Sequence, residues 1–302
     1  AGEIMQEIYR PLSLRNYPVI VTDLETAETI KYAANAFLAM KVTFINEMAM
    51  LCERTGADVK EVASGMGFDQ RIGARFLQAG PGYGGSCFPK DTKALARIGQ
   101  DHSVPLQLVE TAIKVNEEVK RLMIDKIVDL CEGVVRKKKI VILGLTFKAD
   151  TDDMRDAPSL TIVPALVGLG AEVRVVDPKA FREAEELLPG VHWYDDVYQA
   201  TDGADTVVML TEWNEFRALD LKKMAAQMQS PRMADLRNMY SCAYALDAVF
   251  EHYLGMGRAS PRPQYSTPIT CLASSRWTGL LLREVYANCT RANATQSPDP
   301  CN

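Results

Sequence analysis

The chain has 302 residues, of which 47% are hydrophobic, and this length is sufficient for two domains with cores of their own. A formal net charge of −5 and a pI of about 5.4 argue against a nucleic-acid partner. The longest apolar run, residues 140–147, is too short to cross a bilayer, and the first ten residues lack the basic and apolar regions of a signal peptide, so no membrane partner is expected.

The seven cysteines are odd in number and include no Cys-x-x-Cys pair, and the three histidines are scattered. This pattern argues against a disulfide framework and against a zinc site, so we expect no bound metal. Reduced thiols are typical of the cytoplasm, which is where we expect the protein to be.

The first half of the chain has the apolar spacing of helices. A short helix and an apolar run fill residues 1–21, and Thr22 with Glu25 forms a capping box before a long helix. The predicted helices cover residues 24–54, 58–67, 92–98 and 106–131.

From Lys137 onward, apolar runs typical of buried strands alternate with helical segments. This alternation predicts parallel βαβ units and a doubly wound, Rossmann-like sheet, so the fold class is α/β with an all-helical part before the sheet. Ligands of such sheets bind at the carboxyl ends of the strands. The predicted strands are residues 137–147, 171–178, 204–210 and 232–236, with a helix at 159–169.

After about residue 258 the sequence is rich in Ser, Thr, Pro and Arg and has no clear period. We therefore predict that residues 259–302 are mostly disordered.

Residues 80–91, Gly-Pro-Gly-Tyr-Gly-Gly-Ser-Cys-Phe-Pro-Lys-Asp, form the most specific motif of the chain. The glycines allow the backbone to approach a ligand, and Pro89 suits the first turn of a helix. Cys87 is therefore predicted at a helix N-terminus, where the dipole favours a thiolate nucleophile. The alternative is a glycine-rich turn around a buried, inert cysteine.

Other candidate residues are ambiguous from spacing alone. Lys31 and Asn35 share one helix face and could stabilise an oxyanion, or they could be ordinary surface side chains. Asp91 could orient water or the thiol, or only compensate the helix dipole. Arg71 is a lone arginine, typical of a surface. Residues 147–155 place cations and carboxylates past a strand end and could contact phosphate or ribose, or form a polar loop.

One absence is informative. No Gly-x-Gly-x-x-Gly follows a predicted strand, and Gly144 stands alone between two leucines. The dinucleotide-binding fingerprint is therefore not found in this chain.

Taken together, these segments resemble the UDP-glucose 6-dehydrogenases, within the broader UDP-glucose/GDP-mannose dehydrogenase family. The resemblance is ordered and spans about residues 1–240. Arg71-Ile-Gly73 and the Gly-Pro-Gly-Tyr run favour the UDP-glucose branch. The segments that carry the resemblance are residues 27–38, 46–47, 69–73, 80–91, 144–155 and 235–238.

The resemblance implies a four-electron oxidation of a primary alcohol at C6 of the sugar to a carboxylate, with NAD as the cofactor. Cys87 would form a thiohemiacetal and then a thioester, which water would cleave. Lys31 and Asn35 would stabilise the oxyanion, and Asp91 would orient the hydrolytic water or tune the site.

The resemblance also implies binding residues and partners. UDP-glucose would be the substrate, and Arg71 would reach the sugar nucleotide of a neighbouring subunit in a homodimer or higher oligomer. Cofactor contacts would come from Lys90 and Arg155. The remaining substrate-binding residues would be Gly80, Tyr83, Gly84, Phe88, Lys148 and Arg237.

The expected domains follow from these assignments. Residues 1–21 would be the remnant of an N-terminal NAD-binding domain, and residues 22–131 a helical dimerisation domain that carries the cysteine loop. Residues 132–258 would bind the UDP-sugar, and residues 259–302 would form an atypical tail.

Two departures from the family are expected to matter. The NAD-binding domain lies outside the chain, so we expect the 302 residues alone to be inactive. After Asn238 the closing helix and strand of the family are not recognisable, which suggests a change of reading frame. The alternatives are a non-catalytic nucleotide-sugar-binding or oligomer-forming fragment, a GDP-mannose 6-dehydrogenase, and a thioester-forming cysteine enzyme unrelated to NAD.

Overall fold

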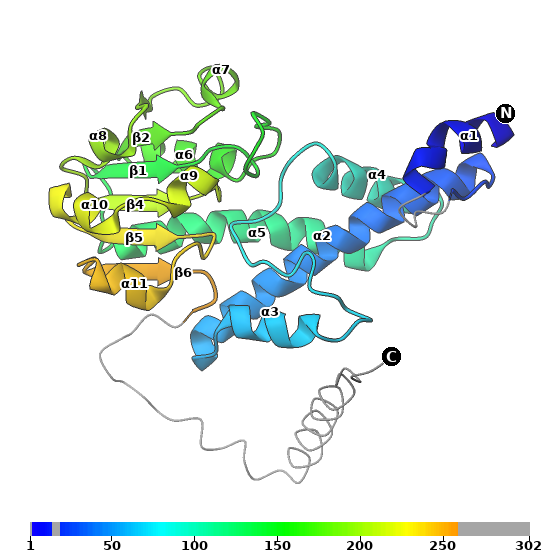
Figure 1. Cartoon of the computed structure of the whole chain (residues 1–302), viewed down its shortest axis with the longest axis horizontal. Coiled ribbons are helices and arrows are strands. Elements are labelled where there is room, and N and C mark those ends of the chain that lie inside the picture. The colour runs from blue at the N-terminus through cyan, green and yellow to red at the C-terminus, as the bar shows by residue number, and fades with distance from the viewer. Residues whose placement is uncertain (1, 14–18, 259–302) are drawn as a thin grey trace, which may run out of the picture. The chain divides into compact units, whose positions relative to one another are not determined.

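A computed structural model describes residues 2–13 and 19–258 (Figure 1). The predicted disordered tail, residues 259–302, lies outside the described residues. None of the described helices combines the length and the apolarity that a membrane crossing requires.

The helical part of the chain agrees with the predicted helices. It contains α1 (Gly2–Ser13), α2 (Leu24–Thr55), α3 (Val59–Gly67), α4 (Phe88–Asp101) and α5 (Gln107–Leu130). Helix α4 begins four residues before the predicted start, because Pro89 is accepted in its first turn. The predicted cap of α2 is wrong by one residue: the carboxylate of Asp23, not the Thr22 hydroxyl, accepts a hydrogen bond from the Thr26 nitrogen at 2.7 Å.

The second half of the described chain forms one parallel sheet of six strands in the order β3-β2-β1-β4-β5-β6. The strand order reverses between β1 and β4, and this place is called the switch point of the sheet. Ligands of such sheets bind beside the carboxyl ends of the two strands at the switch point. The strands are β1 (Lys139–Leu143), β2 (Glu172–Val176), β3 (His192–Trp193), β4 (Thr206–Met209), β5 (Arg232–Asp235) and β6 (His252–Gly255).

Helices connect the strands and cover both faces of the sheet (Figure 1). Ile140 and Ile142 of β1 pack in one core with Met123 and Ile127 of α5. Their neighbour Val141 faces a second core on the opposite side. The connecting helices are α6 (Ser159–Gly168), α7 (Phe181–Ala184), α8 (Val197–Thr201), α9 (Asn214–Arg217), α10 (Leu221–Gln227) and α11 (Cys242–Asp247).

The expectation that no closing helix and strand follow Asn238 is wrong. Helix α11 and strand β6 follow, and β6 pairs with β5 in parallel. Both elements are too short to show a repeating pattern of apolar residues in the sequence. They are held instead by the buried carboxylate of Asp235, which accepts hydrogen bonds from the Tyr240 nitrogen at 2.8 Å and the Tyr253 hydroxyl at 3.0 Å. The reason for expecting a change of reading frame directly after Asn238 therefore no longer holds.

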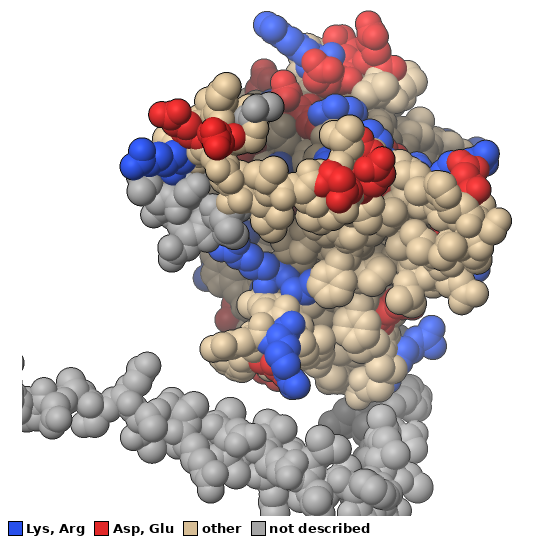
Figure 2. All heavy atoms as spheres, turned by 90° about the vertical axis from the view of Figure 1, so that its right-hand side faces the viewer, with Lys and Arg blue, Asp and Glu red and all other residues tan. Residues whose placement is uncertain are grey.

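One face of α2 is exposed and apolar. Its large side chains repeat every seven residues, and each keeps more than two fifths of its surface exposed: Ile30, Phe37, Phe44 and Leu51. This set is called the α2 stripe below. Figure 2 shows the molecule from the right-hand side of Figure 1, where uncharged atoms form a broad area through the middle of the face.

A single glycine brings the ends of β1 and β4 together. Gly144 follows β1 with a φ of +89°, and a Cβ there would lie 2.8 Å from the backbone nitrogen of Thr211. Any side chain at this position would therefore push apart the two strand ends at the switch point.

We expect Gly144→Ala to destabilise the fold by about 2–5 kcal/mol, since a left-handed conformation and a steric clash add together. Gly133→Ala is the matched control, because Gly133 has a φ of +80° and open space around its Cβ position. Its loss should be only about 1–2 kcal/mol. Urea unfolding of both variants measures the difference, and equal losses would contradict the close contact.

Candidate functional site

Cys87 lies at the N-cap position of α4, as the sequence predicts, and its side chain is exposed. The Asp91 nitrogen donates to the Cys87 carbonyl at 2.8 Å and closes the first helical turn. The Sγ atom lies 3.7 Å from the Ser86 hydroxyl oxygen. The alternative of a buried cysteine is therefore wrong, because the thiol faces solvent at a helix N-terminus, and the reactivity of the thiol stays a prediction.

Two side-chain amides from different helices hold the glycine-rich segment before Cys87. Asn46 of α2 accepts from the Gly80 nitrogen at 2.9 Å, and Asn116 of α5 accepts from the Tyr83 nitrogen at 2.8 Å. Asn116 also donates to the Tyr83 carbonyl at 3.1 Å, and both asparagines are buried. The main chain of the segment is thus fixed without covering the thiol.

The other side of the segment contacts the loop after β1. The Gly85 nitrogen donates to the Arg155 carbonyl at 2.7 Å. A Cβ at Gly85 would lie 2.8 Å from the Phe147 ring, and one at Gly84 would lie 2.9 Å from the Asp156 carbonyl carbon. The glycines therefore permit the cysteine segment to approach the carboxyl edge of the sheet.

Aromatic rings support the residue next to the thiol. The ring of Phe88 lies 5.9 Å from the rings of both Phe76 and Tyr83. Burial raises the pKa of Tyr83 to about 12. The Tyr83 side chain therefore stays neutral at physiological pH and acts here as a packing group.

A buried carboxylate gathers three of the predicted residues. Asp91 has no exposed side-chain surface, and it accepts hydrogen bonds from Lys90 and from Asn35, each at 2.6 Å. The Lys31 ammonium lies 3.4 Å from the same carboxylate. Lys31 and Asn35 come from one face of α2, as their spacing predicts, and the structure brings them to the first turn of α4.

These contacts determine the charge of Asp91. Burial alone would raise its pKa, but the hydrogen bonds of Lys90 and Asn35 and the charge of Lys31 outweigh it and lower the pKa. Asp91 is therefore ionised at neutral pH and holds the cations beside Cys87.

The thiol lies within electrostatic range of two cations. The hydrogen bond to Asp91 raises the pKa of Lys90, and Cys87 adds to this effect. The hydrogen bond to Asp153 raises the pKa of Arg155, and Cys87 again contributes. Lys90 belongs to the helix that starts beside Cys87, and Arg155 belongs to the loop between β1 and α6.

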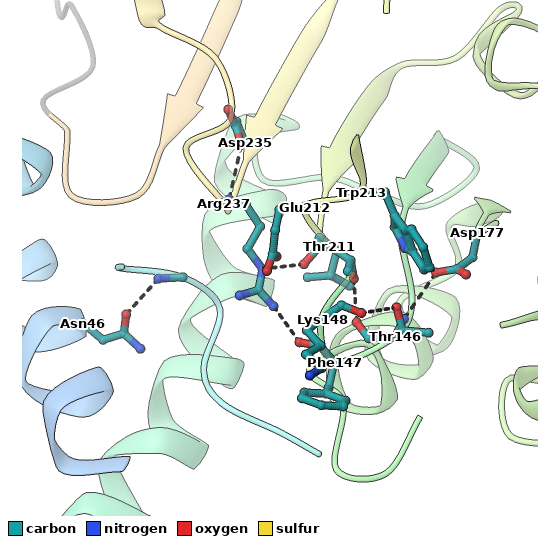
Figure 3. A network of polar contacts seen from close by, with 12 residues as sticks. Asn46, Thr146, Phe147, Lys148, Asp177, Thr211, Glu212, Trp213, Asp235 and Arg237 are labelled. Atoms are coloured by element: carbon teal, nitrogen blue, oxygen red, sulfur yellow. Dashed lines mark hydrogen bonds and ion pairs between the residues drawn. The ribbon is translucent and has the colours of Figure 1, made fainter. Parts of the chain in front are cut away.

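Arg237 joins the loops at the carboxyl edge of the sheet (Figure 3). Its Nε donates to the Leu210 carbonyl at 2.9 Å and its Nη2 to the Phe147 carbonyl at 3.2 Å. Its Nη1 lies 3.2 Å from the Cβ position of Gly80, so the guanidinium borders the glycine-rich segment.

Two predicted residues lie apart from the thiol. The Arg71 side chain is 90% exposed and forms a bidentate ion pair with Asp69. Its hydrogen bonds lower the pKa of Asp69 to about 2. Lys148 is exposed, and its ammonium lies 5.4 Å from the Phe147 ring centre. Neither has a contact with Cys87 in the described structure.

The sequence interpretation missed Asn116 and Glu212. Asn116 stands in a long helical run, where one buried amide leaves no recognisable signal. Glu212 lies past a strand end, where its partner Arg237 is distant in sequence. Among the described residues no group of histidine, cysteine or acidic side chains could hold a metal ion.

An exposed thiol at a helix N-terminus, close to the point where the strand order of a parallel sheet reverses, defines an α/β protein with a candidate nucleophile. Residues 25–118 match the central domain of the UDP-glucose/GDP-mannose dehydrogenase family, and residues 141–242 match its UDP-binding domain. The chain belongs to this family.

Named relatives agree. The chain is 51% identical over 261 residues to a UDP-glucose 6-dehydrogenase of Rhizobium meliloti, covering 85% of the chain and 59% of the relative. It is 44% identical to the UDP-glucose 6-dehydrogenase TuaD of Bacillus subtilis, covering 87% of the chain and 56% of that protein. The chain thus spans less than two thirds of these relatives.

Solved structures also resemble it. A UDP-glucose dehydrogenase from Pyrobaculum islandicum matches with a TM-score of 0.76 and 31% identity, over 85% of this chain and 56% of that one. An NDP-N-acetyl-D-galactosaminuronic acid dehydrogenase from Methanosarcina mazei matches with a TM-score of 0.69 and 29% identity, over 78% and 51%. The predicted fold class and family are confirmed.

We expect Asp91→Asn to destabilise the fold by about 1–3 kcal/mol at neutral pH, because charged hydrogen-bond partners are lost. The lowered pKa of Asp91 means that its contribution is complete above the ordinary aspartate pKa of 3.8 and is lost as the pH falls through the lower, folded value. The free energies of unfolding of the wild type and of Asp91→Asn should therefore approach each other only at acidic pH.

Asp101→Asn is the control on the same helix, because the Asp101 side chain is 53% exposed in its pair with Arg97. Urea unfolding at several pH values measures both variants. A stability difference between wild type and Asp91→Asn that stays constant down to pH values below 3.8 would contradict the buried, ionised carboxylate.

Proposed function

We propose that this chain provides the thiol and the UDP-sugar seat of an NAD-dependent UDP-glucose 6-dehydrogenase, which oxidises UDP-glucose to UDP-glucuronate for polysaccharide synthesis. The observation that carries the proposal is the exposed Cys87 thiol at the N-terminus of α4, beside the buried Asp91 cluster and against the sheet edge. The names of the relatives support this substrate over GDP-mannose. A cytoplasmic location stays a prediction.

The sugar nucleotide would lie along the carboxyl edge of the sheet, near the switch point. The backbone between Gly80 and Gly84 is free of side-chain bulk and could approach a diphosphate. Lys148 and Arg237 would supply positive charge, and the Tyr83 and Phe88 rings would support the segment. We assign the UDP-sugar-binding domain to residues 132–258. The cysteine loop, which would also contact the sugar nucleotide, belongs to the helical dimerisation domain, residues 22–131.

The chemistry would centre on Cys87. Its thiolate would add to the aldehyde carbon at C6, and the second N–H of Asn35 with the Lys31 ammonium would stabilise the oxyanion that forms. After oxidation the sugar carbon would be held as a thioester. Asp91, fixed by three partners, would orient the water that releases the carboxylate and the thiol.

NAD would accept a hydride in each of the two oxidations. Arg155 and Lys90 fit the phosphates of such a cofactor, because both are exposed cations within electrostatic range of Cys87. The Asp177 carboxylate is not suited to bind the ribose of this cofactor. This carboxylate, at the end of β2 where dinucleotide folds place a ribose-binding acid, accepts five hydrogen bonds from protein groups.

A second copy of the chain is the proposed partner. The α2 stripe presents apolar side chains at intervals of seven residues, the spacing with which helices pair along a seam. Arg71 is 90% exposed and lies apart from its own Cys87, so it is available to a neighbouring subunit. A homodimer or a higher oligomer would cover the stripe.

A second candidate is a nucleotide-sugar-binding protein without turnover. It is favoured by the absence of a Gly-x-Gly-x-x-Gly after any strand of the described residues, and by the engaged Asp177. Titration calorimetry with UDP-glucose tests the binding that both candidates require, and steady NADH production in an absorbance assay would exclude the second candidate.

We expect the 302-residue chain to bind UDP-glucose without steady NADH production. Lys148→Ala should weaken binding about tenfold, because a charged phosphate contact is lost. Lys222→Ala, an exposed lysine of α10, is the control and should bind as wild type does. Absence of any UDP-glucose binding by the wild-type chain would refute the proposed substrate.

We expect Phe37→Glu to raise the dimer dissociation constant by at least about tenfold, because an aromatic anchor in a seam is replaced by a charge. Leu169→Glu is the matched control, since Leu169 is 48% exposed at the end of α6 and outside the α2 stripe. Sedimentation equilibrium measures both. A monomeric wild type, or an equal effect of the two variants, would contradict the proposed seam.

A further inference from the structure

Arg237 is a largely buried cation where three loops meet. Its side chain is only 16% exposed, and its two carbonyl partners, Leu210 and Phe147, follow β4 and β1 (Figure 3). Its backbone nitrogen donates to Asp235 at 3.2 Å. The position of the guanidinium is thus set by the backbone around it, without any ligand.

The guanidinium of Arg237 has hydrogen-bond donors left for an anion. Among the described residues, Nη1 makes no hydrogen bond, and it points toward Gly80, where a Cβ would lie 3.2 Å away. Because Gly80 has no side chain, an anion that lies along the glycine-rich segment could reach this group.

Glu212 is the one carboxylate paired with this guanidinium among the described residues. Its Oε2 lies 3.0 Å from Nε, yet this oxygen is buried and accepts no hydrogen bond, because Nε already donates to Leu210. Glu212 therefore balances the charge of Arg237 without a well-directed bond of its own.

The residues on either side of Glu212 are anchored by hydrogen bonds. Thr211, just before it, donates through its hydroxyl to the Thr146 carbonyl at 2.6 Å. Trp213, just after it, donates from its ring nitrogen to Asp177 at 3.3 Å. These bonds place the main chain of Glu212 at the carboxyl ends of the strands, and its pairing with Arg237 places the carboxylate.

We propose that Glu212 competes with the diphosphate of the nucleotide sugar for Arg237 and so keeps binding weak enough for release of the ligand. The inference rests on the proposed function, because it takes a nucleoside diphosphate as the ligand. Glu212 acts through Arg237 and is a positioning residue. Its negative charge repels each phosphate group that approaches the guanidinium.

The test compares the wild-type chain with Glu212→Gln by calorimetry against uridine, UMP and UDP. Removing the charge should tighten UDP binding about tenfold, tighten UMP binding less and leave uridine binding unchanged. The gain should shrink as salt is added, because salt screens the repulsion. A purely structural role would not follow ligand charge or salt.

Glu215→Gln is the matched control, because Glu215 is an exposed glutamate three residues further on, in the first turn of α9. It should bind all three ligands as wild type does. Circular dichroism checks folding. If Glu212→Gln does not fold, Glu212→Asp replaces it, since it withdraws the carboxylate by one methylene and should give a smaller gain in the same ligand order.

Two results would overturn the inference. Unchanged or weaker UDP binding by the folded Glu212 variant, with a wild type that binds UDP, would refute the competition alone. A wild type that binds neither UDP nor uridine would refute the proposed function and the inference with it.

Discussion

The site depends on one constraint, the fixing of the main chain between Gly80 and Gly85 from two sides. Asn46 and Asn116 hold the segment from the helices, and the Arg155 carbonyl holds it from the loop after β1. These bonds use backbone groups of the segment and leave the Cys87 side chain exposed. The thiol therefore has a defined position relative to the switch point of the sheet.

Charge is organised around that position. The buried Asp91 carboxylate holds Lys90, Asn35 and Lys31 at the first turn of α4, while Arg237 and Glu212 form a second, separate pair at the strand ends. The first group suits a negative charge on the sulfur or on the oxygen bound to C6 of the sugar, and the second suits a phosphate. Each cation has an acidic partner, so the site is stable before any ligand arrives.

Patterns of short range predicted most of the fold. The helices α2, α3 and α5 and the four central strands follow from apolar spacing, and Pro89 with the glycines placed Cys87 at a helix start. The short α11 and β6 could not be predicted, because Asp235 fixes them through Tyr240 and Tyr253 rather than through a period. Lys31 and Asn35 could be paired by spacing, but their common partner Asp91 is 56 residues from Asn35.

The most direct measurement is the alkylation rate of Cys87 by iodoacetamide, followed by peptide mass spectrometry with and without UDP-glucose. If the sulfur faces the bound sugar, ligand at ten times its dissociation constant should slow the reaction about tenfold. The partly buried Cys242 should react at the same rate in both samples. An unchanged Cys87 rate at saturating UDP-glucose would contradict the placement of the thiol beside the substrate.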